Sequence, residues 1–292
     1  MRVRRAAILF MFILSILLTG CGGKEYSGFE IDNKESITEA LRGAMIGRSY
    51  ALDIDFTAHT LDDSMPVDLG EEILRGVFYE SEDPKGGDYL KYQYGGCSME
   101  YDTYKDGNEY RYNIRLIPEY YTTADEEEYV DNEISRITDN LGLDKVEDEY
   151  SKVKLIRDYI CENVTYDTVH KHMSGSGHVQ STAYGCLYYH TALCQGYAVL
   201  AYRMLKEQGL DARIITGDLE VNGKTERHAW NIVRIGNEYY NLDITMDDIT
   251  GSYDYFLKSD ESFNVDHRRD ADYDNDTFVN LYQMSGRDYI YE

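Results

Sequence analysis

The sequence is poor in three features that mark large classes of proteins. Basic residues are few, since 29 lysines and arginines stand against 54 aspartates and glutamates, and the formal net charge is −25. This charge excludes nucleic acid as a partner. The patterns C-x-x-C and H-E-x-x-H are missing, so a zinc site has no support. The apolar run from Ala6 to Leu18 is too short to span a bilayer comfortably.

The acidic tail from Asp266 to Thr277 also fails as a calcium loop. An EF-hand counted from Asp272 requires a turn glycine where Thr277 stands and a bidentate glutamate where Gln283 stands. We therefore expect neither a metal site nor a cofactor.

The start of the chain has the pattern of a lipoprotein leader. A basic stretch, Met1 to Arg5, precedes the apolar run, and Leu18-Thr19-Gly20-Cys21 has the form of a lipoprotein signal peptidase box. We expect residues 1–20 to be a signal peptide and residues 21–30 to be the lipidated cysteine with its tether. Acyl chains on Cys21 would hold the protein, outside the cytoplasm, to a bacterial cell membrane.

The strongest chemical signal in the sequence lies at Cys194. Apolar residues recur at helical spacing from Cys194 to about Lys206, so this cysteine falls in the first turn of a predicted helix. The positive end of a helix lowers the pKa of a thiol, and the thiolate is the attacking form of cysteine. The position therefore indicates a nucleophile.

Two later segments supply the groups that a cysteine nucleophile needs. The aromatic and β-branched run after His228 predicts a strand, Gly236-Asn237 a turn, and Glu238 to Asp243 the next strand. His228 and Asp243 can then lie side by side on adjacent antiparallel strands that face the helix end. Asp243 would fix the tautomer of the imidazole and stabilise its charged form.

The other cysteines and a group of histidines have no such context. If Cys21 is lipidated and Cys194 is a free thiol, three cysteines remain, which is an odd number and forms no closed disulfide set: Cys97, Cys161 and Cys186. Cys161, in a predicted helix, and Cys186, in an apolar run, are expected to be core residues. Between Tyr166 and Ala183 the spacing of three histidines matches no metal motif, and we expect a surface loop there: His170, His172 and His178.

These motifs resemble the transglutaminase-like superfamily of cysteine acyltransferases and proteases. Its core pattern runs C-x-G-[YF]-[AS], then H-[AV]-W-[NV], then a strand that ends L-D-x-[TS]. This chain reads Cys194-Gln195-Gly196-Tyr197-Ala198, His228-Ala229-Trp230-Asn231 and Leu242-Asp243-Ile244-Thr245. The resemblance covers about residues 146–270. Its weaker flanks are three. Lys152–Asp167 looks like the helix that precedes the family's core and ends in a Tyr-Asp pair, Ala183-Tyr184-Gly185 resembles the segment that leads into the nucleophile, and Tyr255–Asp260 looks like the closing strand of bacterial members.

The resemblance implies a papain-like catalytic arrangement. In it, Cys194 is the nucleophile, His228 the general acid and base, and Asp243 the orienting carboxylate. The backbone N–H of Cys194 is one natural donor for an oxyanion, because N–H groups at a helix start lack intrahelical partners. Tyr166 and Tyr188 are candidates for the second donor or for substrate contact.

The expected architecture is an α+β fold in two domains. The catalytic domain, residues 124–292, would pack the helix bearing the cysteine on an antiparallel sheet, and it includes a joining helix at residues 124–140. A small α+β domain, residues 31–123, would precede it. Its pattern predicts helices at residues 36–46 and 67–79, a strand at residues 50–57, and two strands around Asp106-Gly107.

The expected chemistry is a thioester on Cys194. Hydrolysis of the thioester makes the protein a peptidase or amidase, whereas capture by an amine makes it a cross-linking transglutaminase, and the same triad serves both. Because no amine site is evident, the interpretation favours hydrolysis of a peptide or protein in the cell envelope. A non-catalytic envelope protein that keeps the fold for binding is the rival, and the sequence leaves the oligomeric state open.

Overall fold

The computed structural model describes residues 3–7, 34–62, 64–169 and 179–291 and divides the chain into two compact units. The first unit takes Met1–Ser81 and Lys85–Tyr120, and the second takes Glu82–Pro84 and Tyr121–Glu292. Most of the predicted signal peptide, the predicted lipidation site Cys21 and the three histidines of the predicted surface loop lie outside the described residues. Across the described residues, no helix is long and apolar enough to cross a membrane.

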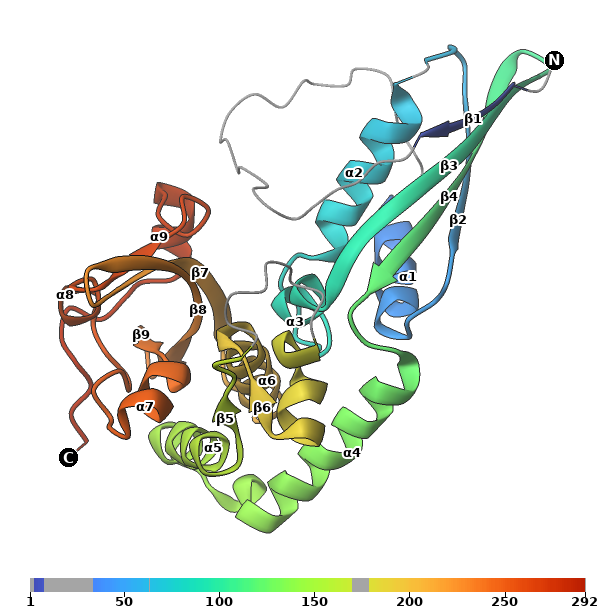
Figure 1. Cartoon of the computed structure of the whole chain (residues 1–292). Coiled ribbons are helices and arrows are strands. Elements are labelled where there is room, and N and C mark those ends of the chain that lie inside the picture. The colour runs from blue at the N-terminus through green and yellow to red at the C-terminus, as the bar shows by residue number, and fades with distance from the viewer. Residues whose placement is uncertain (1–2, 8–33, 63, 170–178, 292) are drawn as a thin grey trace. The chain divides into compact units, whose positions relative to one another are not determined.

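The first unit packs helices on an antiparallel sheet with the strand order β1-β3-β4-β2 (Figure 1). Its strands are β1 Val3–Ala7, β2 Leu52–Ala58, β3 Tyr94–Asp106 and β4 Glu109–Tyr120, and its helices are α1 Lys34–Ile46, α2 Met65–Val77 and α3 Gly87–Tyr92. Alternate residues of β2 are buried, the pattern of a strand with one face on a core. Gly107, with φ of 63°, makes the tight turn between β3 and β4. β1 lies before the predicted cleavage site, so cleavage there would leave β3 at the sheet edge.

The second unit contains a second antiparallel sheet, with the strand order β10-β7-β8-β9, and helices around it. Its strands are β5 Thr165–Tyr166, β6 Thr191–Ala192, β7 Ala212–Val221, β8 Lys224–Ile235, β9 Glu238–Leu242 and β10 His267–Arg269. Its α-helices are α4 Ala124–Leu141, α5 Glu149–Asn163, α6 Cys194–Glu207, α7 Ile244–Thr250, α8 Asp260–Phe263 and α9 Asp276–Leu281. Short helical segments lie at Leu143–Lys145, Val179–Ser181 and Gly185–Tyr189, the last of them a π-helix. The predicted α+β fold with an antiparallel sheet is confirmed.

The helix α6 lies at the centre of the second unit and packs on β7 and β8. Every residue from Gly196 to Leu205 is buried, as expected for a helix covered on all sides. The side chain of Asn231 on β8 donates a hydrogen bond to the carbonyl oxygen of Ala198 and so ties the helix to the sheet. A Cβ atom at Gly196 would clash with the carbonyl oxygen of Gln180, so this close approach requires glycine two residues after Cys194.

Two expectations for the segment after β8 are wrong in detail. The strand predicted to contain Asp243 ends at Leu242, and Asp243 is instead the N-cap of α7. The segment Tyr255–Asp260 forms no closing strand; it makes one bridge, between Lys258 and Asn241. The reason is the backbone of Leu257, whose φ of 51° lies in the left-handed region and interrupts an extended run.

The outer strand β10 approaches β7 closely at Gly217. A Cβ atom at this position would clash with the carbonyl oxygen of Arg268 and lie 2.9 Å from the Trp230 ring. We predict that Gly217→Ala lowers the stability of the second unit by about 2 kcal/mol, the usual cost of overpacking. Trp230 is the only tryptophan in the chain and is buried, so its fluorescence during urea denaturation measures this unit. Gly286→Ala, which places a Cβ in open space, is the matched control. Equal stability of the two variants would contradict the prediction.

Candidate active site

Three elements bring Cys194, His228 and Asp243 together. Cys194 is the first residue of α6, His228 lies on β8, and Asp243 lies between β9 and α7. The Cys194 thiol hydrogen-bonds the His228 ring, and Nε2 of His228 lies 2.6 Å from Oδ2 of Asp243. The exposed fractions of His228 and Asp243 are 7% and 0%, whereas Cys194 is partly exposed. The result is a continuous chain of interactions from a buried carboxylate through the imidazole to the thiol of a partly exposed residue.

The surroundings of Cys194 favour the thiolate. Burial raises the pKa of the thiol, but the hydrogen bond and charge of His228, with the N–H of Ala229, outweigh burial and lower the pKa below its ordinary value. The other cysteines of the described part differ, because burial dominates and raises their pKa values: Cys97, Cys161 (to about 12) and Cys186. The direction of the pKa shift thus sets Cys194 apart from the two buried cysteines, Cys97 and Cys186, and from Cys161, which is partly exposed and not the core residue expected.

The charged forms of His228 and Asp243 support each other. Burial lowers the pKa of the imidazole, but the nearby carboxylate of Asp243 more than compensates and raises the pKa of His228 to about 10. Burial likewise opposes ionisation of Asp243, yet the charges and hydrogen bonds of His228 and His267 hold the pKa of this carboxyl below its usual range. At neutral pH the arrangement therefore favours an imidazolium between two anions.

Asp243 is oriented through both carboxylate oxygens. Oδ1 accepts a hydrogen bond from the N–H of Met246 at 3.0 Å, the N-cap interaction that begins α7. Oδ2 faces the His228 ring. A residue that the motif requires for chemistry is therefore also the residue that starts a helix.

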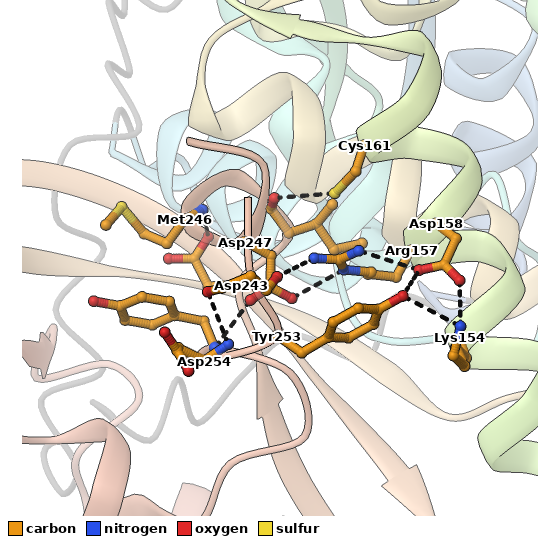
Figure 2. Close-up of polar contacts among 12 residues, drawn as sticks. Lys154, Arg157, Asp158, Cys161, Asp243, Met246, Asp247, Tyr253 and Asp254 are labelled. Atoms are coloured by element: carbon orange, nitrogen blue, oxygen red, sulfur yellow. Dashed lines mark hydrogen bonds and ion pairs between the residues drawn. The ribbon is translucent and has the colours of Figure 1, made fainter. Parts of the chain in front are cut away.

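The helix α7 is in turn held by α5 and α6. The buried carboxylate of Asp247 lies 3.1 Å from Nε of Arg157 on α5 and accepts the N–H of Tyr255 at 2.9 Å (Figure 2). Burial raises the pKa of Asp247 to about 6, and the charge of Arg157 acts in the opposite direction. Asp248 accepts a hydrogen bond of 2.6 Å from the hydroxyl of Tyr197 on α6. Neither aspartate was singled out from the sequence.

The guanidinium of Arg157 has several partners besides Asp247. It bonds Asp158 at 3.1 Å and the carbonyl oxygen of Ser252, and it lies 3.8 Å from the ring centroid of Tyr253 (Figure 2). The Tyr253 hydroxyl donates to Asp158 at 2.5 Å, and Lys154 bonds the same carboxylate group. This network fixes α7, and with it Asp243, to α5.

His267 is a further member of the site that sequence reasoning missed. Its Nε2 lies 3.1 Å from Oδ2 of Asp243, and its Nδ1 lies 2.6 Å from Oδ1 of Asp266. In the sequence this segment has only the pattern of a failed calcium loop, and a lone histidine in an acidic stretch gives no signal by itself. His228, Asp243 and His267 carry ligand atoms close enough together to hold a metal. However, Nε2 of His228 and Nε2 of His267 each lie at hydrogen-bond distance from Oδ2 of Asp243, and a proton between nitrogen and oxygen accounts for each separation.

The structure separates the two tyrosine candidates. Tyr166 lies opposite Ala192 in the parallel pair β5 and β6, two residues before the nucleophile. Burial raises its pKa, and the charges of Cys194 and Asp243 raise it further, which is consistent with a position close to the site. Tyr188 is instead 51% exposed. Its ring packs against a surface cluster of tyrosines: Tyr129, Tyr184 and Tyr189.

The start of α6 supports an oxyanion donor at Cys194. The N-cap residue is Leu193, so the N–H of Cys194 lies in the first helical turn, where N–H groups have no intrahelical partner. The neighbouring Gln195 directs its side chain to the carbonyl oxygen of Ser181 at 3.3 Å. These features leave the first backbone donors of the helix next to the thiol.

A thiol, an imidazole and a carboxylate on an α+β core define a papain-like class of cysteine site. Residues 139–244 match the family model of the transglutaminase-like superfamily, and this segment includes all three residues. The chain therefore carries a transglutaminase-like core domain, and the resemblance seen in the sequence is confirmed. No curated protein matches the chain.

Solved structures that are similar to the chain include the following three. The first, a TGase, has 17% identity and a TM-score of 0.37, with 66% of this chain and 51% of that chain covered. A proposed cysteine protease from Cytophaga hutchinsonii has 18% identity and a TM-score of 0.33, with coverages of 52% and 65%. The periplasmic domain of TgpA from Pseudomonas aeruginosa has 11% identity and a TM-score of 0.32, with coverages of 56% and 75%. The chain thus spans about half the length of the first structure and about two thirds of the length of the second.

The buried pair of Arg157 and Asp247 gives a stability prediction. Asp247→Asn removes the negative partner and leaves a buried guanidinium with less compensation, so we expect a loss of about 3 kcal/mol. The measurement is urea denaturation followed by Trp230 fluorescence. Asp254→Asn makes the same chemical change at an exposed position of the same segment and should cost less than about 0.5 kcal/mol. If both variants unfold at the wild-type denaturant concentration, the network does not hold α7.

Proposed function

We propose that this protein is a cysteine acyl-transfer enzyme that cleaves peptide or amide bonds through a thioester on Cys194. The observation that carries the proposal is the hydrogen-bonded chain from Cys194 through His228 to Asp243. In this chain the thiol has a lowered pKa and the imidazole a raised one. Such an ion pair makes a strong nucleophile at neutral pH and keeps a proton ready for the leaving group.

In the first step, the Cys194 thiolate attacks the carbonyl carbon and forms a carbon–sulfur bond. The carbonyl oxygen becomes an oxyanion, which the N–H of Cys194 at the start of α6 can stabilise. When the carbon–nitrogen bond breaks, the His228 imidazolium gives its proton to the departing amine. An acyl thioester and a neutral imidazole remain.

In the second step, water attacks the thioester carbonyl while His228 removes its proton. The carbon–sulfur bond breaks, the acid product leaves, and the thiolate–imidazolium pair is restored. Asp243 stays ionised throughout and supports the charged imidazole. An amine in place of water would give a new amide, which is the transglutaminase outcome, so the partition between water and amine separates the two activities.

The proposed setting is the cell envelope. The signal peptide pattern and the cysteine at position 21 support a chain that is exported and anchored by lipid, with peptide or protein substrates outside the cytoplasm. Cys21 lies outside the described residues.

Selective alkylation tests the nucleophile. With limiting iodoacetamide at pH 6, we expect Cys194 to react at least about tenfold faster than an ordinary thiol, because its lowered pKa keeps more thiolate present. Peptide mass spectrometry locates the label, and the three cysteines with raised pKa values are internal controls: Cys97 and Cys186, which are buried, and Cys161, which is partly exposed like Cys194. The advantage should disappear in His228→Ala. Equal labelling of Cys194 and the three control thiols would remove the assignment and favour the non-catalytic binding protein.

Acyl transfer tests the reaction. With p-nitrophenyl acetate as the acyl donor, the wild-type chain should form acetyl-Cys194, visible by intact mass, and the thioester should decay to acetate. Addition of monodansylcadaverine should leave the decay rate and product unchanged if the enzyme is a hydrolase. Acetylated amine as the main product would instead identify a transferase. Cys194→Ala is the control, and acetylation of that variant at the wild-type rate would contradict the proposed function.

A further inference from the structure

His267 is brought to the site by the short outer strand β10. In the antiparallel register His267 lies opposite Leu219 of β7, and the strand approaches β7 over the bare backbone of Gly217. The N–H of Glu220 donates to the carbonyl oxygen of Asp266 at 2.8 Å, which fixes the residue before the histidine. The pairing of β10 with β7 therefore brings this imidazole within hydrogen-bond distance of Asp243.

Both ring nitrogens of His267 face carboxylates. Nε2 lies 3.1 Å from Asp243 and Nδ1 lies 2.6 Å from Asp266. An ionised carboxylate only accepts hydrogen bonds, so the bond to Asp243 is one in which Nε2 of His267 donates. The Tyr255 hydroxyl donates to the second oxygen of Asp266 at 2.9 Å. The ring centroids of His267 and His228 lie 5.5 Å apart.

Aromatic rings hold the orientation of His267. Phe263 stacks on it with ring centroids 3.8 Å apart and an interplanar angle of 24°. Trp230 and Tyr255 meet it edge-on at 5.2 and 5.7 Å. The residue is only 1% exposed, so rotation of the ring would displace packed neighbours. The hydrogen bond from Nε2 to Asp243 is therefore directional and preorganised.

The consequence falls on Asp243. Its Oδ1 is held by the N–H of Met246, and its Oδ2 faces two imidazoles, from His228 and His267. Without His267, one interaction, the bond to His228 itself, would remain to hold Oδ2. The side chains lie in a row from the outer carboxylate of Asp266 through His267, Asp243 and His228 to Cys194.

We propose that His267 is a positioning residue for the acyl-transfer site, because it donates a hydrogen bond to Oδ2 of Asp243 and thereby holds that carboxylate against His228. The inference rests on the proposed function of the triad and extends it to a residue outside the family motif. His267 touches neither the thiol nor the scissile bond and acts through Asp243.

Three substitutions separate the donor from the packing. In His267→Gln, the side-chain amide nitrogen can reach the place of Nε2, so the bond to Asp243 is retained. In His267→Asn, the amide nitrogen reaches the place of Nδ1 and bonds Asp266 alone. His267→Phe keeps a ring that can stack on Phe263 and removes both donors. A positioning role predicts rescue by glutamine, whereas a purely structural role predicts that the variants rank by packing.

The readouts are acetylation of Cys194 by p-nitrophenyl acetate and the pH profile of its alkylation. We expect His267→Gln to stay within about threefold of the wild-type acetylation rate, and the Asn and Phe variants to lose about 10- to 100-fold, as when a group that orients a reactive residue is lost. In His267→Phe, the midpoint of the alkylation profile should move upward by about one pH unit, toward that of an ordinary thiol. In His267→Gln it should stay in place.

Wild-type rates and an unchanged profile in His267→Phe would overturn the inference, and so would equal losses in all three variants. A downward shift of the midpoint would also contradict the inference. That result would mean that His267 weakens the effect of Asp243 on the pKa of the thiol. Failure of the proposed function looks different. If the wild-type chain forms no acetyl thioester, the acyl-transfer proposal fails, and the alkylation profiles still decide whether His267 positions the carboxylate.

Discussion

A buried carboxylate is stable only when its charge is met by hydrogen bonds and opposite charge, and the geometry around Cys194 depends on how Asp243 meets this demand. Its partners are the N–H of Met246 and the rings of His228 and His267. Each contact stabilises the folded structure and would also serve the proposed chemistry. The same carboxylate that begins α7 raises the pKa of the imidazole, and the imidazole in turn lowers the pKa of the thiol.

Hydrogen bonds in the surrounding fold hold these contacts in place. The helix α7, which carries the capped end at Asp243, is tied to α5 through Asp247 and to α6 through Asp248. The helix α6 is tied to the sheet that carries His228 through Asn231. Cys194, His228 and Asp243 therefore belong to one hydrogen-bonded framework, in which displacement of one element would be resisted by the others.

Local patterns predicted much of this unit, because helical periodicity and strand composition are properties of neighbouring residues. The helix that starts at Cys194 and the hairpin that carries His228 are of this kind. His267 could not be found in this way, since its strand is three residues long and its meaning comes only from pairing with β7. The expected closing strand failed at Leu257, because a positive φ at a residue other than glycine has no sequence signature there.

The central claim is that Asp243 keeps His228 charged beside the thiol. Nitrogen-15 NMR of histidine-labelled protein measures this directly, with the His228 signals identified among the 7 histidines by their absence in His228→Gln. The account predicts that the ring remains doubly protonated through neutral pH and loses its proton only near pH 10. Loss of the proton near the ordinary histidine value of about 6.5 would contradict it.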